Sequence, residues 1–168
     1  EEAYFAAGIS EEITGRLGSL SGLKVISRKS AQRYADTDKT LQEIGEELDV
    51  GYVLDGTVRW ARNPDGTSRV RITPELIRVA DESQLWSNTY DRTIDDIFEV
   101  QSDIASQVIG ELGVTLLEGE QQAVESRPTE NIEAYQAYLR GVEYANHPDF
   151  TELNMRLAIE MFQRAAEL

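Results

Sequence analysis

The sequence predicts an α/β (α+β) protein in which a mixed sheet, with an antiparallel meander and flanking helices, is followed by an α-helical hairpin. Three observations support this class. Apolar residues recur with a period of two between residues 52 and 91, which is typical of half-buried strands. Before and after this region they recur every three or four residues, as on one face of a helix. The composition is 40% hydrophobic and 28% charged, with no apolar run of the roughly 18–20 residues that a membrane helix needs.

Three short elements are predicted ahead of the strand region. A helix is expected over residues 8–20, with Ser10 as its candidate N-cap and a regular apolar face. The segment LKVISR, residues 23–28, is predicted to form a short strand. A second helix is expected to start at Thr40 and Glu43, because a hydroxyl followed three residues later by a carboxylate forms a capping box.

The strand region predicts a hairpin followed by a third strand. Residues 52–60 and 70–76 alternate apolar with polar side chains on either side of the turn sequence NPDG, residues 63–66. Pro74 has no N–H for a ladder bond, so we expect a bulge or an exposed edge there. A third strand over residues 84–91 completes an antiparallel meander.

Two large aromatic residues and an arginine stand out at the end of this region. Trp86 and Tyr90 are four residues apart on the predicted third strand, so they face the same side. Large aromatic side chains on a half-buried sheet usually belong to the core. Arg92 is expected to pair with a neighbouring acid. We therefore interpret this stretch as a structural element.

Four acids surround the start of the long helix predicted after the third strand. Asp91, Asp95, Asp96 and Glu99 would form a cation site or an acid pair if their carboxylates converged. Acids at a helix start also complement the helix dipole, which requires no ligand. We favour the second interpretation.

The remaining segments predict a linker and two helices. Residues 119–129 are polar, include Pro128, and are expected to link the sheet domain to the helices after it. Helical patterns then cover residues 132–145 and 152–168. The predicted domains are therefore 1–118, a linker over 119–129, and a helical hairpin over 130–168.

Charge and residue usage exclude several kinds of site. The net charge is −15, of which −11 falls on residues 95–168, so the chain repels phosphate backbones and direct nucleic-acid binding is not expected. The chain has no cysteine, which excludes disulfides and thiolate chemistry. Its one histidine, His147, lies beside a proline in a predicted turn, so we assign it no catalytic role. No catalytic, cofactor-binding or metal-binding residue is assigned.

Five motifs in order resemble those of TolB-like amino-terminal domains, with the resemblance extending over roughly residues 4–112. They are FAAGISEEI (5–13), GLKVISR (22–28), YVLDGTVR (52–59), VRIT (70–73) and LWSNTYDR (85–92). Such domains usually begin with an apolar strand that this sequence lacks. The resemblance therefore implies an exposed sheet edge, and exchange of a strand or edge pairing between two chains of a homodimer is one route by which it would be covered.

The last part of the chain resembles the start of a tetratricopeptide repeat region, with Ala134-Tyr135 and Tyr138-Leu139-Arg140-Gly141 in its first helix. Repeats of this kind hold peptides on a concave face. The candidate peptide-binding residues are therefore Tyr135, Tyr138, Arg140 and Tyr144. Packing within the repeat is the alternative role for these side chains. Because one repeat cannot bury both of its faces, further repeats are expected after Leu168.

Together the two resemblances imply a non-catalytic regulatory or protein-interaction module of a larger bacterial signalling protein, of the cyclase-, kinase- or CadC-type regulator-linked kind. The chain starts without a methionine, so we expect a longer parent, in which an enzymatic domain such as a nucleotide cyclase would lie elsewhere. The expected partner is a protein or peptide, with membrane contact only through other parts of the parent. Both the periplasm and the cytoplasm stay open. The alternative function is a sensor of a small ligand or an envelope signal, which one tight ligand in a thermal-shift screen would favour.

Overall fold

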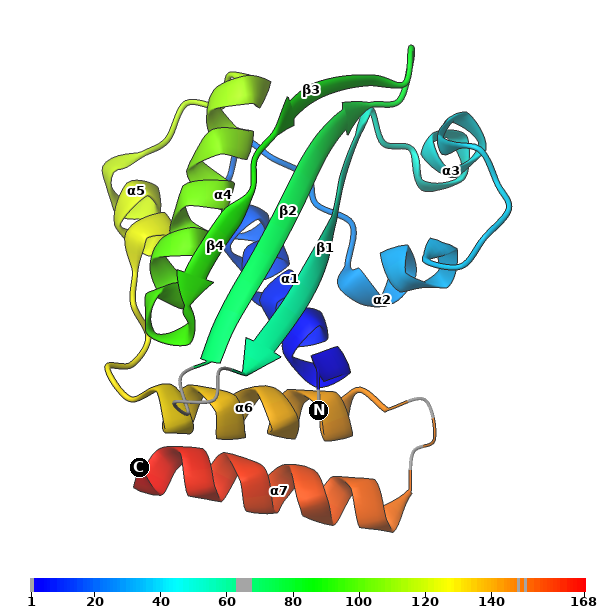
Figure 1. The fold of residues 1–168 in the computed structure, drawn as a ribbon. Coiled ribbons are helices and arrows are strands. Elements are labelled where there is room, and N and C mark those ends of the chain that lie inside the picture. Colours follow the sequence, from blue (N-terminus) through cyan, green and yellow to red (C-terminus); the bar gives the residue numbers. More distant parts are fainter. Residues whose placement is uncertain (1, 63–67, 148, 150) are drawn as a thin grey trace. The chain divides into compact units, whose positions relative to one another are not determined.

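The computed structural model describes residues 2–62, 68–147, 149 and 151–168. They fold into two compact units, Ile13–Ser126 and Glu1–Glu12 with Arg127–Leu168. The first unit holds the sheet and most of the helices, and the second holds a helical hairpin (Figure 1). The predicted α+β class is confirmed.

The sheet contains β1 (Tyr52–Arg62), β2 (Ser68–Arg78), β3 (Ser83–Ser87) and β4 (Tyr90–Thr93). Strand β2 pairs with β1 on one side and with both β3 and β4 on the other. Every pairing among the described strands is antiparallel, so the mixed sheet expected from the sequence is an antiparallel one in this part of the chain. The predicted hairpin is confirmed in its two strands, while its NPDG turn lies outside the described residues.

The predicted third strand is divided in two opposite Pro74. Pairing of β2 with β3 reaches Glu75 opposite Ser87, and pairing with β4 resumes at Ile72 opposite Tyr90. A bulge or an exposed edge was expected at the proline. The ladder between β2 and β3 shifts register between Leu76 and Ile77, and the ladder between β2 and β1 stays regular through Pro74. Because proline cannot donate a backbone hydrogen bond, it is tolerated in this central strand where the neighbouring strand is interrupted.

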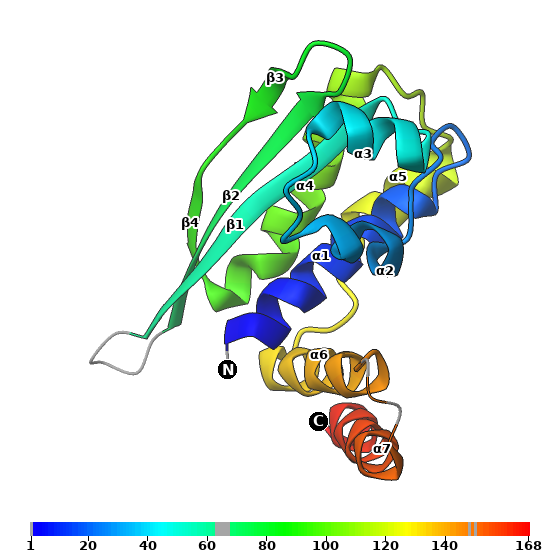
Figure 2. The ribbon, with the colours of Figure 1, turned by 90° about the vertical axis from the view of Figure 1, so that its right-hand side faces the viewer.

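One face of the sheet carries the core of this unit. Val70, Ile72 and Leu76 of β2 alternate with exposed or half-buried residues and are themselves buried. Helix α4 (Ile97–Leu112) and residues 13–18 of α1 (Glu2–Gly18) lie on this side of the sheet, while no helix of this unit covers the opposite face in the described residues (Figures 1 and 2). The apolar face of α4 is buried along its length, as its broad periodicity predicts. Its largest buried side chains are Ile97, Phe98, Val100, Ile104, Val108 and Ile109.

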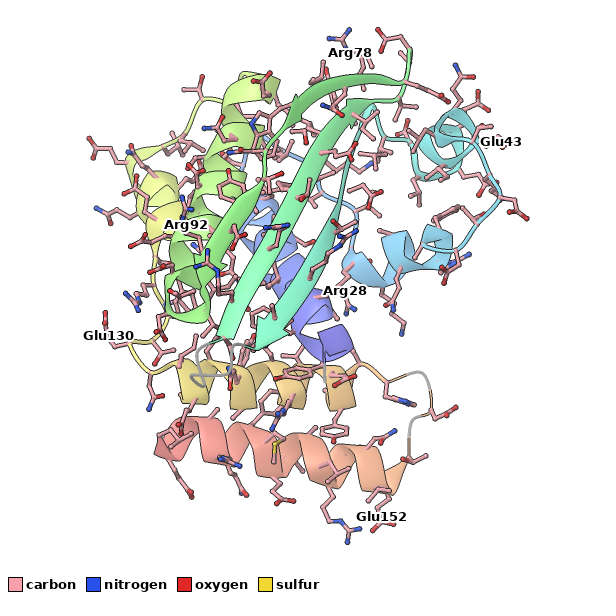
Figure 3. All side chains as sticks on the ribbon, viewed as in Figure 1. Arg28, Glu43, Arg78, Arg92, Glu130 and Glu152 are labelled. Atoms are coloured by element: carbon pink, nitrogen blue, oxygen red, sulfur yellow. The ribbon has the colours of Figure 1, made fainter. Side chains whose placement is uncertain are left out.

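Helix α3 (Leu41–Leu48) starts at the capping box that the sequence predicts. The Thr40 N–H donates to Glu43 Oε2 at 2.7 Å, and the Glu43 N–H donates to Thr40 Oγ1 at 3.3 Å. Figure 3 labels the Glu43 side chain on α3. These two bonds satisfy backbone donors that a helix start otherwise leaves open. The prediction at this helix is therefore confirmed.

The strand predicted over residues 23–28 is wrong. Residues 23–27 have no regular secondary structure, and Arg28 begins the short helix α2 (Arg28–Ala31), which continues into the 3₁₀ turn η1 (Gln32–Tyr34). A strand requires a neighbouring strand for its backbone bonds. No described strand pairs with this segment, so its apolar alternation does not produce one.

The predicted start of the first helix is also wrong. Helix α1 begins at Glu2, and Ser10 lies inside it, with its Oγ donating to the Ala6 carbonyl at 3.1 Å. Phe5 and Ile9 are buried at a spacing of four, which extends the apolar face one turn earlier than the capping signal indicates. Burial of this face outweighs the preference of serine for a cap.

A helix occupies the segment predicted to be a linker. Helix α5 (Glu118–Glu125) has Glu120 at its start, which accepts from the Leu117 N–H at 2.9 Å and the Ser21 N–H at 2.7 Å. Val124 is buried. Two backbone hydrogen bonds and one buried valine thus hold in place a segment whose polarity predicts a linker.

The second unit contains α6 (Ile132–Ala145) and α7 (Glu152–Glu167), within a residue of the predicted bounds. Asn131 and Thr151 cap them, each accepting from a backbone N–H of the first turn. Gly141 lets the two helices approach closely, because a Cβ there would lie 2.5 Å from Cε1 of Phe162. Among the described residues, none of the helices combines the length and apolarity of a membrane span.

Candidate interaction surfaces

The four residues predicted to form a peptide-binding face of α6 have different environments. Tyr135 is 2% exposed and Tyr138 is 39% exposed, with their rings stacked at 6.4 Å between centroids. Tyr144 is half-buried. Arg140 is half-buried and places its guanidinium 5.1 Å from the centre of the Tyr4 ring, a cation–π contact. Of the four, Tyr138 presents the largest exposed fraction to a partner.

Helix α7 exposes an apolar row that the sequence analysis missed. We call Met155, Ile159 and Phe162 the α7 stripe; they are 47%, 55% and 37% exposed and follow one another at spacings of four and three. The ring of Phe162 lies 6.0 Å from that of Tyr138, so the row continues onto α6. The signal was present in the sequence, because α7 carries more apolar positions than packing against one partner helix requires.

The acids at the start of α4 do not converge. Asp96 Oδ2 accepts from Thr93 Oγ1 at 2.8 Å, while Asp95 and Glu99 are exposed. Asp91 binds side chains of β2 instead. Within the described ranges no group of three or more His, Cys, Asp or Glu side chains is placed to hold a metal ion. Asp95, Asp96 and Glu99 lie in the first turns of η2 (Ile94–Asp96) and α4, where acids complement the helix dipole.

Asp91, one of the three acids (Asp91, Asp95 and Asp96) with which Arg92 was expected to pair, pairs instead with two arginines of β2. Nε and Nη2 of Arg69 donate to Asp91 Oδ1 at 3.0 and 2.7 Å. Nε and Nη2 of Arg71 donate to Oδ2 at 3.2 and 2.5 Å. Hydrogen bonds from Arg71, which have the largest effect, and from Arg69 hold the pKa of Asp91 below its usual value. Arg92 donates instead to the Asp91 carbonyl at 3.1 Å.

Asp91 and these arginines of β2 line a shallow hollow on the face of the sheet that none of the described helices of its own unit covers. Its volume is about 370 Å³, and its lining consists of Arg59, Trp60, Ala61, Arg69, Arg71 and Asp91. The sequence analysis did not single out these arginines, since Arg59 and Arg71 are only polar positions of the predicted strands 52–60 and 70–76, and Arg69 lies just before the second. Their gathering depends on the register that places Arg59 opposite Arg71 and Arg71 opposite Asp91.

The two aromatic residues of the third-strand region lie on the same side, as predicted. Trp86 is opposite Leu76 and half-buried, and Tyr90 is opposite Ile72 and buried. The Tyr90 hydroxyl donates to Asp103 Oδ2 of α4 at 2.6 Å. This bond joins β4 to α4, so Tyr90 contributes to the framework of the sheet unit.

Ionisation of Tyr90 is expected to weaken the fold at high pH. Burial, with the bond to Asp103 adding to it, raises the pKa of Tyr90 to about 12. Since the folded pKa exceeds the unfolded value of about 10, this contribution is complete below pH ~10 and is lost as the pH rises through about 12. At neutral pH, Tyr90→Phe should lower the free energy of unfolding by about 1–2 kcal/mol. Urea unfolding should show this difference narrowing above pH ~10; a difference independent of pH would contradict the assignment.

Comparison with known proteins gives one informative relative. No family model matches the chain. The chain is 36% identical over all 168 residues to "Putative adenylate cyclase 3" of Rhizobium meliloti (strain 1021), and it spans 27% of that protein's length. Among solved structures, a PelC dodecamer variant from Paraburkholderia phytofirmans is similar with a TM-score of 0.40 and 23% identity, over 63% of this chain and 75% of that one. At this TM-score the structural likeness supports no inference about assembly or ligand.

The sequence relative bears on the predicted context. A protein named as an adenylate cyclase contains a segment similar to this whole chain, which agrees with the cyclase-associated, bacterial signalling setting expected above. The TolB-like and tetratricopeptide resemblances stay predictions.

Proposed function

We propose that this chain is a non-catalytic regulatory module that acts by protein–protein contact within a larger signalling protein of the cyclase-associated kind. Within this proposal, residues 1–118 correspond to a TolB-like domain and residues 130–168 to the first helical pair of a tetratricopeptide region. The order of the five motifs and the α6–α7 hairpin support this interpretation. The similarity to a segment covering 27% of a protein named as a cyclase supports the regulatory context.

The α7 stripe is the observation that carries the proposal. Isolated exposed apolar residues are common, but three on one helix face, continued by Tyr138, form a contiguous surface. If a partner buried these side chains, the removal of their apolar area from water would favour binding by roughly 25 cal/mol per Å². An apolar helix face of this kind fits a protein or peptide partner, and Tyr138 is the predicted peptide-binding residue placed beside it.

A chimera tests both the regulatory role of the chain and its action through the α7 stripe. In Putative adenylate cyclase 3, this chain would replace the aligned segment, and cyclic AMP formation would be measured. We expect the chimera to remain active and Ile159→Asp to change its rate by about fivefold or more, since coupling energies between regulatory and active sites are typically 1–3 kcal/mol. The matched control is Glu160→Ala, an exposed polar position on the same helix, which should leave the rate unchanged.

Two results would count against the proposal. Equal rates of cyclic AMP formation by the chimera with and without Ile159→Asp would contradict a regulatory role for the α7 stripe. Formation of cyclic AMP from ATP by the isolated 168-residue chain would remove the non-catalytic assignment. Because Ile159 is exposed, its substitution should leave the melting temperature of the chain nearly unchanged, which separates a lost contact from a lost fold.

The homodimer expected from the sequence remains a prediction. Strand β1 ends the described sheet order and has only β2 as a neighbour. It therefore supplies the kind of edge through which a second chain would add a strand.

A further inference from the structure

Three arginines gather on the uncovered face of an otherwise acidic protein. Arg59 of β1 lies directly opposite Arg71 of β2, and Arg69 is two residues before Arg71, so all three side chains leave the same face. Val70 and Ile72, which alternate with Arg69 and Arg71 along β2, are buried on the other face. With Asp91 included, this arginine cluster has a net charge of +2, whereas the whole chain carries −15.

Asp91 fixes two members of the cluster in place. Arg69 and Arg71 each use Nε and Nη2 to hold one oxygen of its carboxylate. A guanidinium has five N–H donors, so each arginine keeps its Nη1 donors for a further acceptor. In the described part of the chain, neither Nη1 has a hydrogen-bond partner, and Arg59 has no ion pair. The cluster thus offers several ordered, unused donors in one shallow hollow.

Like charges directly opposite each other on a sheet are destabilising. The Arg59–Arg71 pair has this arrangement, and only one carboxylate offsets the three guanidinium groups of the cluster. An anionic partner would relieve this repulsion. Arg59 and Arg71 keep a donor edge for bidentate pairing, the geometry in which arginine binds carboxylates most strongly, whereas Nη2 of Arg69 also donates to the Asp91 carbonyl at 3.4 Å and leaves only Nη1.

The charge pattern around the cluster favours a short segment. Two rows along the same face, beyond the Thr57–Thr73 pair, Asp55 lies opposite Glu75. A long polyanion following the strands would meet these acids and the negative surface of the whole chain, which argues against a nucleic acid. A short acidic segment that crosses the strands at the arginine cluster avoids the Asp55–Glu75 pair and most of the negative surface.

We propose that Arg59, Arg69 and Arg71 form a docking site for a short carboxylate-rich segment of a partner protein. The site lies on the sheet and uses no residue of the α7 stripe, so it goes beyond the function proposed above and stands or fails independently of it. The small volume and open form of the hollow suit a few acidic side chains reaching the surface from a partner.

Fluorescence anisotropy with a fluorescein-labelled peptide of alternating glutamate and serine tests the site on the 168-residue chain. We expect saturable binding that weakens as salt is added, because exposed charge pairs are screened. Arg59→Glu should weaken binding at least about tenfold, since it removes a charge-assisted pair and adds a repulsive carboxylate. Arg59 makes no ion pair among described residues, so this variant should keep the fold, which the melting temperature checks.

The control is Arg33→Glu, which changes the net charge by the same amount at an exposed position of η1. It should leave peptide binding nearly intact, as should Ile159→Asp in the α7 stripe. Equal weakening by Arg33→Glu and Arg59→Glu would show a response to overall charge and would overturn the site. Absence of binding by the unmodified chain would also overturn it, and tighter binding of a single-stranded oligonucleotide than of the peptide would assign the cluster to phosphate instead.

Discussion

Replacing Ile104 with alanine is expected to lower the free energy of unfolding by about 3 kcal/mol, because large-to-small changes in a packed core lose apolar burial and leave a cavity. Ile104 is 0% exposed and lies on the face of α4 that packs against the sheet, between the buried Ile97 and Val108. Urea unfolding followed by tryptophan fluorescence measures the effect. Both tryptophans, Trp60 and Trp86, belong to the sheet, so the signal reports on this unit.

The matched control for this change is Ile159→Ala, whose unfolding is followed by far-ultraviolet circular dichroism because α7 belongs to the other unit. The same side chain is deleted at a position that is 55% exposed, so the free energy of unfolding should change by no more than about 0.5 kcal/mol. A comparable loss at both positions would contradict the placement of α4 as the main apolar cover of the sheet. It would also contradict the assignment of the α7 stripe as a free surface.

Replacing Arg16 with methionine should destabilise the sheet unit by about 3 kcal/mol, since two backbone carbonyls lose a charged donor. Arg16 is buried on α1, and its Nη1 and Nη2 donate to the carbonyls of Val124 and Ser126, the latter at 2.9 Å. Its Nη1 also donates to Ser102 Oγ at 3.2 Å. These bonds tie the end of α5 to α1 and α4. Methionine keeps most of the apolar stem, so the loss is specific to the hydrogen bonds.

Amide hydrogen exchange locates the effect of the Arg16 change. Exchange over α5 should accelerate more than over β2, because the bonds to Arg16 hold the α5 end and do not contact the strand. Arg33→Met, at an exposed position, serves as the control and should alter neither stability nor exchange. Uniform acceleration across the unit would indicate that Arg16 acts on the whole fold.

The sequence alone was sufficient to predict features that depend on residues close together in the chain. The Thr40–Glu43 capping box, the alternation that forms β1 and β2, and the helices α6 and α7 all appear as predicted. In each case the deciding interactions, a backbone bond to a nearby side chain or a repeating apolar face, lie within a few residues. The fold class and the structural role of Tyr90 follow from the same local patterns.

Other features depended on partners far away in the sequence. Residues 23–27 alternate like a strand but have no strand to pair with, and α1 starts early because Phe5 and Ile9 are buried. A buried arginine more than a hundred residues away supports α5, in a segment whose composition predicts a linker.

The arginine cluster combines local features that the sequence predicts with an arrangement that depends on residues far apart in the sequence. The sequence predicted that Arg59 and Arg71 would be polar members of alternating strands, with Arg69 just ahead of the second strand. Only the tertiary structure decided that they share one uncovered face and that Asp91 lies between two of them. Strand register and the choice of the face that helices cover are set by packing across the whole unit, because a single-residue shift would move every side chain to the other side.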